Sequence, residues 1–258
     1  MKDLRLHAPV APRQVFCTIG NYSGQLIEAA EDSGDGPAGA GAGARREAAL
    51  GAIQERRRSG APYICLKPSS TVRDPTGALV INAEHTMLDW EVELGVIIGD
   101  AGGELTIEQA ASAIAGYCVV NDITLRSAVF REEPPRFGTD WLQSKGGRGW
   151  LPAGPWFVPS WNVSDASALR LWLRLNGTLM QDGCTDDMVF GIAEQIAYLS
   201  RHVALLPGDL ICTGSPAGFG SHLGRFLRPG DVVEAGIDGL GTQRISFIEG
   251  SPSSHPRY

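Results

Sequence analysis

The chain has 258 residues, which fits one large domain or one domain with a small appendage. Its 33 glycines and 16 prolines favour strands joined by turns over a helical bundle. The formal net charge of −7 argues against nucleic-acid and membrane-surface partners, and no apolar stretch approaches the ~20 residues of a membrane span. Five dispersed cysteines without a C-x-x-C pair, and an N-terminus without a signal-peptide core, predict a cytoplasmic protein.

The first sixty residues differ in texture from the rest. Residues 13–22 predict a short apolar strand that ends in a polar turn. The segment from Ser33 to Ala44 has no large apolar side chain, which predicts a flexible lid, and a helix is expected from Arg45 to Arg58. We therefore expect a small N-terminal segment over residues 1–60 and a strand-rich main domain over residues 61–258.

The main domain alternates strand and turn signals with two helices. Strands are expected over residues 89–98 and 116–122, and a hairpin turn at Asn176-Gly177. Thr106 and Gln109 have capping-box spacing before one short helix. A second helix has its apolar stripe at Met188, Ile192, Ile196 and Leu199, and Asp186 or Asp187 is expected to open it.

Two glutamates stand out on the strand over residues 89–98. Glu91 and Glu93 leave the same face, roughly 6–7 Å apart, and Asp122 ends the following strand. Carboxylates this close repel unless a cation or protons intervene, and oxygen ligands without His or Cys favour magnesium, manganese or calcium. The alternative is that both glutamates simply line the solvated face of a strand.

Residues 214–220 form a glycine-rich turn after an apolar strand. Backbone N–H groups in such a turn can bind an anion, although a plain tight turn explains the same letters. The turn matches neither a P-loop nor a dinucleotide fingerprint. No G-x-S-x-G elbow appears, and the histidines have no metal-ligand spacing.

Several strings, in order and spacing, resemble the fumarylacetoacetate hydrolase family from about Tyr63 to Ile248. They are DWEVELGVIIG, GYCVVNDITLR, LNGTLMQDGCTDDMVFGIAEQIAYLS, LLPGDLICTGSPAGFG and LRPGDVVEAGIDGLG. The resemblance implies an α+β, predominantly β fold, a mixed β-sandwich roll that is usually dimeric. It also implies activity on 2-oxo acids such as acylpyruvates.

The resemblance assigns roles to particular residues. It implies one Mg²⁺ or Mn²⁺ ion, with Ca²⁺ as a further candidate, held by Glu91, Glu93 and Asp122. Lys67 and Lys145 match lysines that stabilise negative charge on the substrate. The positions that match substrate-contacting ones are Arg126, Gln181 and Thr213.

Two departures from the family pattern bear on the reaction. The family's hydrolases carry N-Y-x-x-H-x-x-E, and here Glu28 is present while Gln25 occupies the histidine position. An amide is not a general base near neutral pH, so the usual activation of water is altered. In the family's K-S-F-D-x-F loop, Arg148 replaces the aspartate, as either an added anion contact or a solvated side chain.

Three functions follow as hypotheses. The leading one is a metal-dependent hydrolase of an acylpyruvate-like C–C bond, in which water is activated by Glu28, by the metal or by a residue of the longer lid. Gln25 is expected to orient the water or a substrate oxygen. The second is a decarboxylase, isomerase or dehydratase that needs the same enolate stabilisation but no activated water. The third is a silent metal-binding scaffold, which has no need to keep three repelling carboxylates together.

Overall fold

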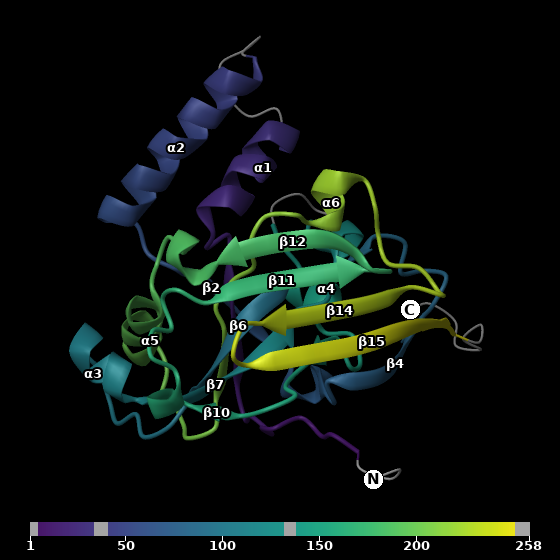
Figure 1. The fold of residues 1–258 in the computed structure, drawn as a ribbon. Coiled ribbons are helices and arrows are strands. Elements are labelled where there is room, and N and C mark those ends of the chain that lie inside the picture. Colours follow the sequence, from purple (N-terminus) through teal and green to yellow (C-terminus); the bar gives the residue numbers. More distant parts are fainter. Residues whose placement is uncertain (1–4, 34–40, 132–137, 251–258) are drawn as a thin grey trace.

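The computed structural model describes residues 5–33, 41–131 and 138–250. The expected lid from Ser33 to Ala44 therefore lies largely outside the described residues. Within them, the strands form a six-stranded sheet, a five-stranded sheet and two short strand pairs (Figure 1). The strand-rich α+β prediction is confirmed.

The six-stranded sheet has the order β10-β7-β6-β13-β1-β2. Its strands are β10 (Val158–Pro159), β7 (Ile114–Asn121), β6 (Val92–Ile98), β13 (Leu210–Cys212), β1 (Val15–Ile19) and β2 (Tyr63–Lys67). The strand expected at residues 13–22 is β1, and it pairs in parallel with β13 and antiparallel with β2. The N-terminal segment thus contributes an inner strand of this sheet, and a boundary after residue 60 stays a prediction.

The five-stranded sheet has the order β12-β11-β14-β15-β4. Its strands are β12 (Thr178–Cys184), β11 (Arg170–Leu175), β14 (Val232–Ile237), β15 (Gly241–Glu249) and β4 (Thr76–Ile81). Asn176 and Gly177 join β11 to β12 with φ of 51° and 84°, which is the geometry of the expected hairpin turn. The short pairs are β3 (Val72–Arg73) with β9 (Leu151–Pro152), and β5 (Leu88–Asp89) with β8 (Thr124–Leu125).

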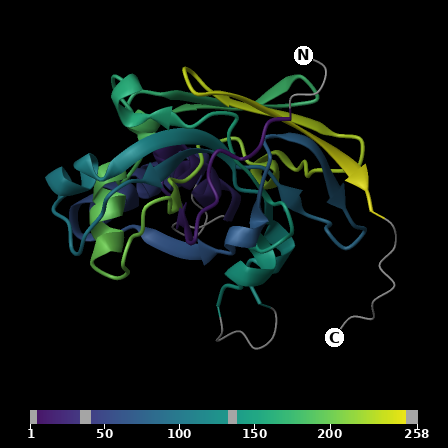
Figure 2. The same ribbon diagram turned by 90° about the horizontal axis from the view of Figure 1, so that it is seen from below.

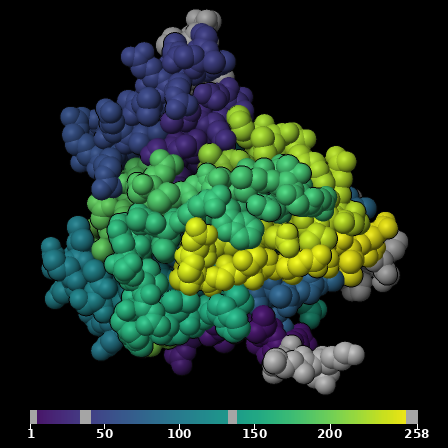
Figure 3. All heavy atoms as spheres, viewed as in Figure 1, coloured from purple at the N-terminus to yellow at the C-terminus, as the bar shows by residue number. Residues whose placement is uncertain are grey.

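Six helices accompany the sheets in the described residues. They are α1 (Ser23–Ser33), α2 (Ala42–Ser59), α3 (Ile107–Ser112), α4 (Trp141–Lys145), α5 (Ile192–Ser200) and α6 (Gly220–Leu223). Helices α1 and α2 pack side by side and project from the body of the molecule (Figures 1 and 3). No helix in the described ranges has both the length and the apolar character needed to cross a membrane.

The expected start of α5 is wrong. Gly191 is the N-cap, and the Glu194 carboxylate accepts a hydrogen bond from its N–H at 2.6 Å. Asp187 lies before the helix and instead accepts a hydrogen bond from Gly24 N–H in the first turn of α1, at 2.8 Å. The Asp187 side chain, which the local sequence pattern assigns to the N-cap of α5, is therefore used in a contact with α1 instead.

The core fills the space between the two sheets, which lie in layers (Figure 2). Leu94 and Val96 of β6 belong to the same buried cluster as Leu173 and Phe247 of the opposite sheet. The other face of the six-stranded sheet carries a second buried cluster, so every residue of β6 is buried. The solvated strand face considered for Glu91 and Glu93 is therefore wrong, and both carboxylates lie inside the protein.

Candidate active site

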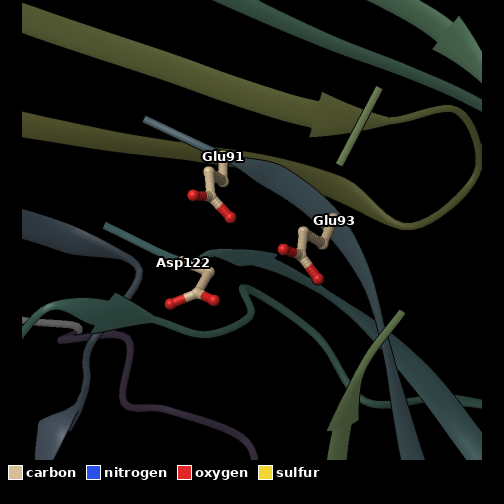
Figure 4. A group of neighbouring side chains, drawn as sticks. All are labelled: Glu91, Glu93 and Asp122. Carbon is tan, nitrogen blue, oxygen red and sulfur yellow. The ribbon is translucent and has the colours of Figure 1, made fainter. Parts of the chain in front are cut away.

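The three acidic residues singled out in the sequence converge at the ends of β6 and β7 (Figure 4). Glu91 directly precedes β6, Glu93 belongs to it, and Asp122 directly follows β7, the antiparallel neighbour of β6. One oxygen of each carboxylate lies within 4.8 Å of the other two, and the residues are only 5%, 1% and 0% exposed. A main-chain hydrogen bond from Asp122 N–H to Glu91 C=O, 2.9 Å long, fixes the two strand ends together.

Two buried lysines approach Asp122 from different elements. Lys67 at the end of β2 donates to Asp122 Oδ1 at 2.7 Å, and Lys145 at the end of α4 donates to Oδ2 at 2.5 Å. Lys145 Nζ also lies 3.3 Å from Glu91 Oε2 and donates to Thr124 Oγ1 at 2.8 Å. Burial alone would raise the pKa of the Asp122 carboxyl, but the two ammonium groups lower it well below its usual range.

Glu93 lacks such a counter-charge. Its Oε2 accepts a hydrogen bond from Gly214 N–H at 2.7 Å, and no ion pair reaches it from the part of the chain that the structure describes. Burial first, then the charges of Asp122 and Glu91, raise the pKa of Glu93 well above its usual value. The charge of Lys145 opposes this shift only in part, and a buried carboxylate beside two others without an ion pair of its own fits a divalent metal site with hard oxygen donors.

Arg126 and Asp89 support this group of side chains, which we call the charge cluster (Glu91, Glu93, Asp122, Lys67 and Lys145). The Arg126 guanidinium bonds Asp89 Oδ2 through Nε at 2.9 Å and lies 2.8 Å from Glu91 Oε1 through Nη2. It also stacks over the ring of Phe219, 4.5 Å from the ring centroid. Asp89 in turn accepts hydrogen bonds from Gly220 N–H at 2.8 Å and Ser221 N–H at 3.2 Å. Asp89 thereby connects the charge cluster to the start of α6.

The glycine-rich turn over residues 214–220, with Thr213 directly before it, lies against the same strand end. The Thr213 hydroxyl donates to Leu94 C=O at 2.9 Å. The Gln181 amide oxygen accepts from Val92 N–H at 3.0 Å, while its nitrogen donates to Ser215 Oγ and to Pro216 C=O. Gly218 has a φ of +98°, and a Cβ there would lie 1.9 Å from Met180 C=O, so only glycine fits this approach. Both Thr213 and Gln181 therefore use their polar atoms to hold the turn on β6.

The predicted lid residues lie on α1, outside the charge cluster. Gln25 and Glu28 are one helical turn apart and partly buried. The Glu28 carboxylate accepts a hydrogen bond from Gly218 N–H at 2.8 Å, which ties α1 to the glycine-rich turn. Arg148 is exposed and lines a groove together with Arg73 and Arg131, a groove whose lining does not include the three carboxylates.

Sequence reasoning missed two charged groups in this region. Asp89 directly precedes the Trp90-Glu91 pair, and its position at the head of an alternating strand is a local signal that could have suggested it. His222 has no such signal, because its partners Glu28 and Asp32 lie on α1, about 190 residues earlier in the chain. Only the folded structure brings this histidine beside the two carboxylates of α1, in what we call the histidine group (His222, Glu28 and Asp32).

Comparison with known proteins identifies the family of this chain. The model of the fumarylacetoacetate (FAA) hydrolase C-terminal domain matches residues 14–247, and the chain belongs to this family. The chain is 40% identical over 193 residues to 2,4-didehydro-3-deoxy-L-rhamnonate hydrolase of Sphingomonas sp. (strain SKA58), covering 73% of this chain. It spans only 65% of that relative's length.

Solved structures of similar proteins extend the comparison. The 2-hydroxyhepta-2,4-diene-1,7-dioate isomerase from Mycobacterium marinum is 27% identical with a TM-score of 0.73, covering 97% of this chain and 80% of that one. Maleylpyruvate hydrolase from Sphingobium sp. SYK-6, determined with manganese(II) and pyruvate, is 24% identical with a TM-score of 0.70, covering 95% of this chain and 74% of that one. At that identity the second likeness is one of fold. Hydrolases and isomerases thus share this architecture, and the relatives are enzymes.

Proposed function

We propose that this protein is a divalent-metal-dependent hydrolase that cleaves a C–C bond of a 2-oxo acid carrying a second carbonyl group, as in an acylpyruvate. The observation that carries the proposal is the buried convergence of Glu91, Glu93 and Asp122 around a position that lysines neutralise only in part. The similarity to a hydrolase of 2,4-didehydro-3-deoxy-L-rhamnonate supports a 2-oxo acid as substrate class.

The residues of the charge cluster divide the chemistry between them. Glu91, Glu93 and Asp122 would hold Mg²⁺ or Mn²⁺, which supplies Lewis-acid stabilisation of the negative charge that develops on a 2-oxo group. Lys67 and Lys145 add fixed positive charge beside the same position, and burial keeps that charge effective. The Thr124 hydroxyl holds Lys145 in place.

The residues predicted to bind substrate keep that role as proposals. Arg126 contacts Glu91 and is proposed to meet the anionic end of the substrate beside the charge cluster. Thr213 and Gln181 are proposed to shape the turn that covers the substrate, since their polar groups hold that turn. Arg148 is proposed as an anion contact in its own groove.

A second candidate function is a non-hydrolytic reaction on a related acid, namely decarboxylation, isomerisation or dehydration. It is favoured by the amide of Gln25 at the position where the family's hydrolases carry histidine, and by the similarity to an isomerase. Such a reaction uses the same stabilisation of an enolate and requires no activated water.

One experiment separates these functions. Purified protein is incubated with acylpyruvates, oxaloacetate and 2,4-didehydro-3-deoxy-L-rhamnonate, with magnesium or manganese, and the products are analysed by mass spectrometry. Hydrolysis gives two acids whose summed mass exceeds that of the substrate by one water. Loss of carbon dioxide, loss of water or a new product of unchanged mass would instead support the second candidate. Undiminished turnover in excess chelator would refute the metal site.

We also propose that the protein works as a homodimer. Leu66 of β2, Phe130 and Leu142 of α4 are 62%, 72% and 71% exposed, which is unusual for large apolar side chains. Leu142 lines both the groove that contains Phe130 and the neighbouring hollow that contains Leu66, so the three form one surface. Light scattering should give twice the chain mass, and Leu66→Asp combined with Leu142→Asp should give a monomer.

A further inference from the structure

Helix α6 lies against α1 (Figure 1), and its His222 side chain contacts two carboxylates of α1. Its Nδ1 lies 2.9 Å and 3.0 Å from the two oxygens of Asp32, and its Nε2 lies 3.7 Å from Glu28 Oε1. Because an ionised carboxylate only accepts hydrogen bonds, Asp32 places the imidazole proton on Nδ1. The lone pair of Nε2 then points toward the Glu28 carboxylate.

An imidazole lone pair and a carboxylate oxygen at this distance repel each other unless a proton lies between them. At lower pH a proton therefore sits on Nε2 of His222, next to Glu28. At higher pH Nε2 is unprotonated and can accept a proton from water. The charged side chains that face His222 are Glu28, Glu31 and Asp32, all from α1. Burial lowers the pKa of His222, but these carboxylates outweigh it and raise the pKa above its usual value.

The surroundings link this pair to the reacting centre. Glu28 accepts from Gly218 N–H, and Gly218 C=O accepts from the indole N–H of Trp90, which precedes Glu91. Asp89 holds the first residues of α6 and the guanidinium that contacts Glu91. The side chains of His222 and Glu28 are 29% and 22% exposed, so water reaches them, whereas the charge cluster is closed.

We propose that His222 and Glu28 form the proton-accepting pair of this enzyme, with Asp32 fixing the imidazole, and that they replace the imidazole missing at position 25. The inference rests on the proposed hydrolysis. Water gives a proton to Nε2, and its oxygen bonds to the carbonyl carbon of the acyl group. The C–C bond breaks, its electron pair passes to the carbon beside the 2-oxo group, and that carbon takes up the proton from Nε2, which restores the neutral imidazole. One water is consumed, and a carboxylic acid and a 2-oxo acid result.

The test compares variants in hydrolysis of an acylpyruvate across pH. His222→Gln should lower kcat about 10²–10⁴-fold with little change in KM, as for loss of a general base. Asp32→Asn keeps the imidazole but removes the carboxylate that raises its pKa, so the acidic limb of the pH–rate profile should move to lower pH. His202→Gln is the matched control, because His202 is an exposed histidine at the end of α5, against Tyr198.

A second measurement does not depend on substrate. NMR of ¹³C-labelled histidine gives the titration of each imidazole, and the signal lost in His222→Gln identifies His222. Its pKa should fall in both Asp32→Asn and Glu28→Gln and stay unchanged in His202→Gln.

The two measurements separate the failure of this inference from the failure of the proposed function. If the wild-type protein hydrolyses acylpyruvates while His222→Gln stays within about threefold and keeps the same acidic limb, the inference is overturned and the hydrolase stands. If the wild-type protein hydrolyses no 2-oxo acid, the proposed function fails. The inference, which rests on that function, then fails with it. A pKa of His222 that is unaffected by the loss of Glu28 or Asp32 overturns the inference even if the protein hydrolyses acylpyruvates.

Discussion

The charge cluster around Asp122 and the His222–Glu28–Asp32 group on α6 and α1 are both built from acids and bases, but in different surroundings. The charge cluster is closed to solvent, and its lysines have their ammonium groups bonded to carboxylates. The histidine group is partly exposed, and its side chains come from α1 and α6. Burial suits charge stabilisation, whereas access to water suits proton exchange. The two proposals together therefore assign charge stabilisation and proton exchange to separate places in the molecule.

The largest expected effect is loss of turnover when a carboxylate of the charge cluster is removed. Glu93→Gln and Asp122→Asn should each lower kcat by about 10³-fold or more, because a lost metal ion removes several kcal/mol of charge stabilisation. Steady-state kinetics with saturating magnesium or manganese checks this. Full activity of either variant would remove that carboxylate from the metal site.

The same two substitutions should differ in their effect on stability when metal is absent. Asp122→Asn takes from buried Lys67 its ion-pair partner and leaves Lys145 with only the Glu91 carboxylate, 3.3 Å away, so the free energy of unfolding should fall by about 3–5 kcal/mol. Glu93→Gln removes a buried carboxyl group whose charged form is disfavoured and has no ion pair among the described residues, so it should stabilise the metal-free protein. Urea unfolding in the presence of chelator gives both values.

The pH dependence of Glu93→Gln sharpens this contrast. The pKa of Glu93 is raised in the folded state, so the folded protein holds a proton that the unfolded chain releases near pH 4.5. Stability of the metal-free wild type should therefore fall as pH rises above that value, and the advantage of Glu93→Gln should grow. An advantage that is constant from pH 5 to pH 8 would mean that Glu93 carries no raised pKa.

The sequence predicts much of the charge cluster but little of the histidine group. Alternation identifies β6, and the Asn-Gly pair identifies the β11–β12 hairpin, because both signals are local. The convergence of Glu91, Glu93 and Asp122 follows from the family resemblance, since pairing of β6 with β7 is not written in either strand alone. That both faces of β6 are buried depends on layers of structure that no single strand reveals.

The histidine group and its surroundings depend on contacts between segments far apart in the chain, and a local sequence pattern cannot predict such contacts. Asp187 matches a helix-cap residue in sequence, yet it bonds the first turn of α1. His222 stands in a short helix after a glycine-rich turn and meets Asp32, 190 residues away. The sequence shows that Gln25 stands where the family's hydrolases carry histidine, but only the fold shows that His222 lies beside Glu28.

A smaller effect is expected from moving the imidazole back to α1. In the His222→Gln background, Gln25→His places a histidine one turn from Glu28, and it should recover part of the lost hydrolysis, about 10-fold within the 10²–10⁴-fold range of general-base catalysis. The double variant is compared with His222→Gln alone by kcat at the pH optimum. Recovery in the double variant supports exchangeable positions for the base. No recovery, with both variants folded, would show that position 25 does not reach the reacting water.

The smallest effect is the contribution of the histidine group to the free energy of unfolding, and its sign follows from the raised pKa of His222. The folded protein holds the imidazole proton more tightly than the unfolded chain, so the contact with Asp32 and Glu28 stabilises the fold fully below the unfolded pKa near 6.5 and ceases to do so as pH rises through the folded pKa. Because these side chains are partly exposed, the gain should lie within the ~0–1 kcal/mol typical of such pairs. Wild type should therefore exceed His222→Gln in unfolding free energy at pH 5.5 and match it at pH 9, while His202→Gln shows no such trend. A difference independent of pH would mean that His222 stabilises the α1–α6 contact by packing alone. The histidine group would then not exchange protons, and its proposed contrast with the closed charge cluster would fail.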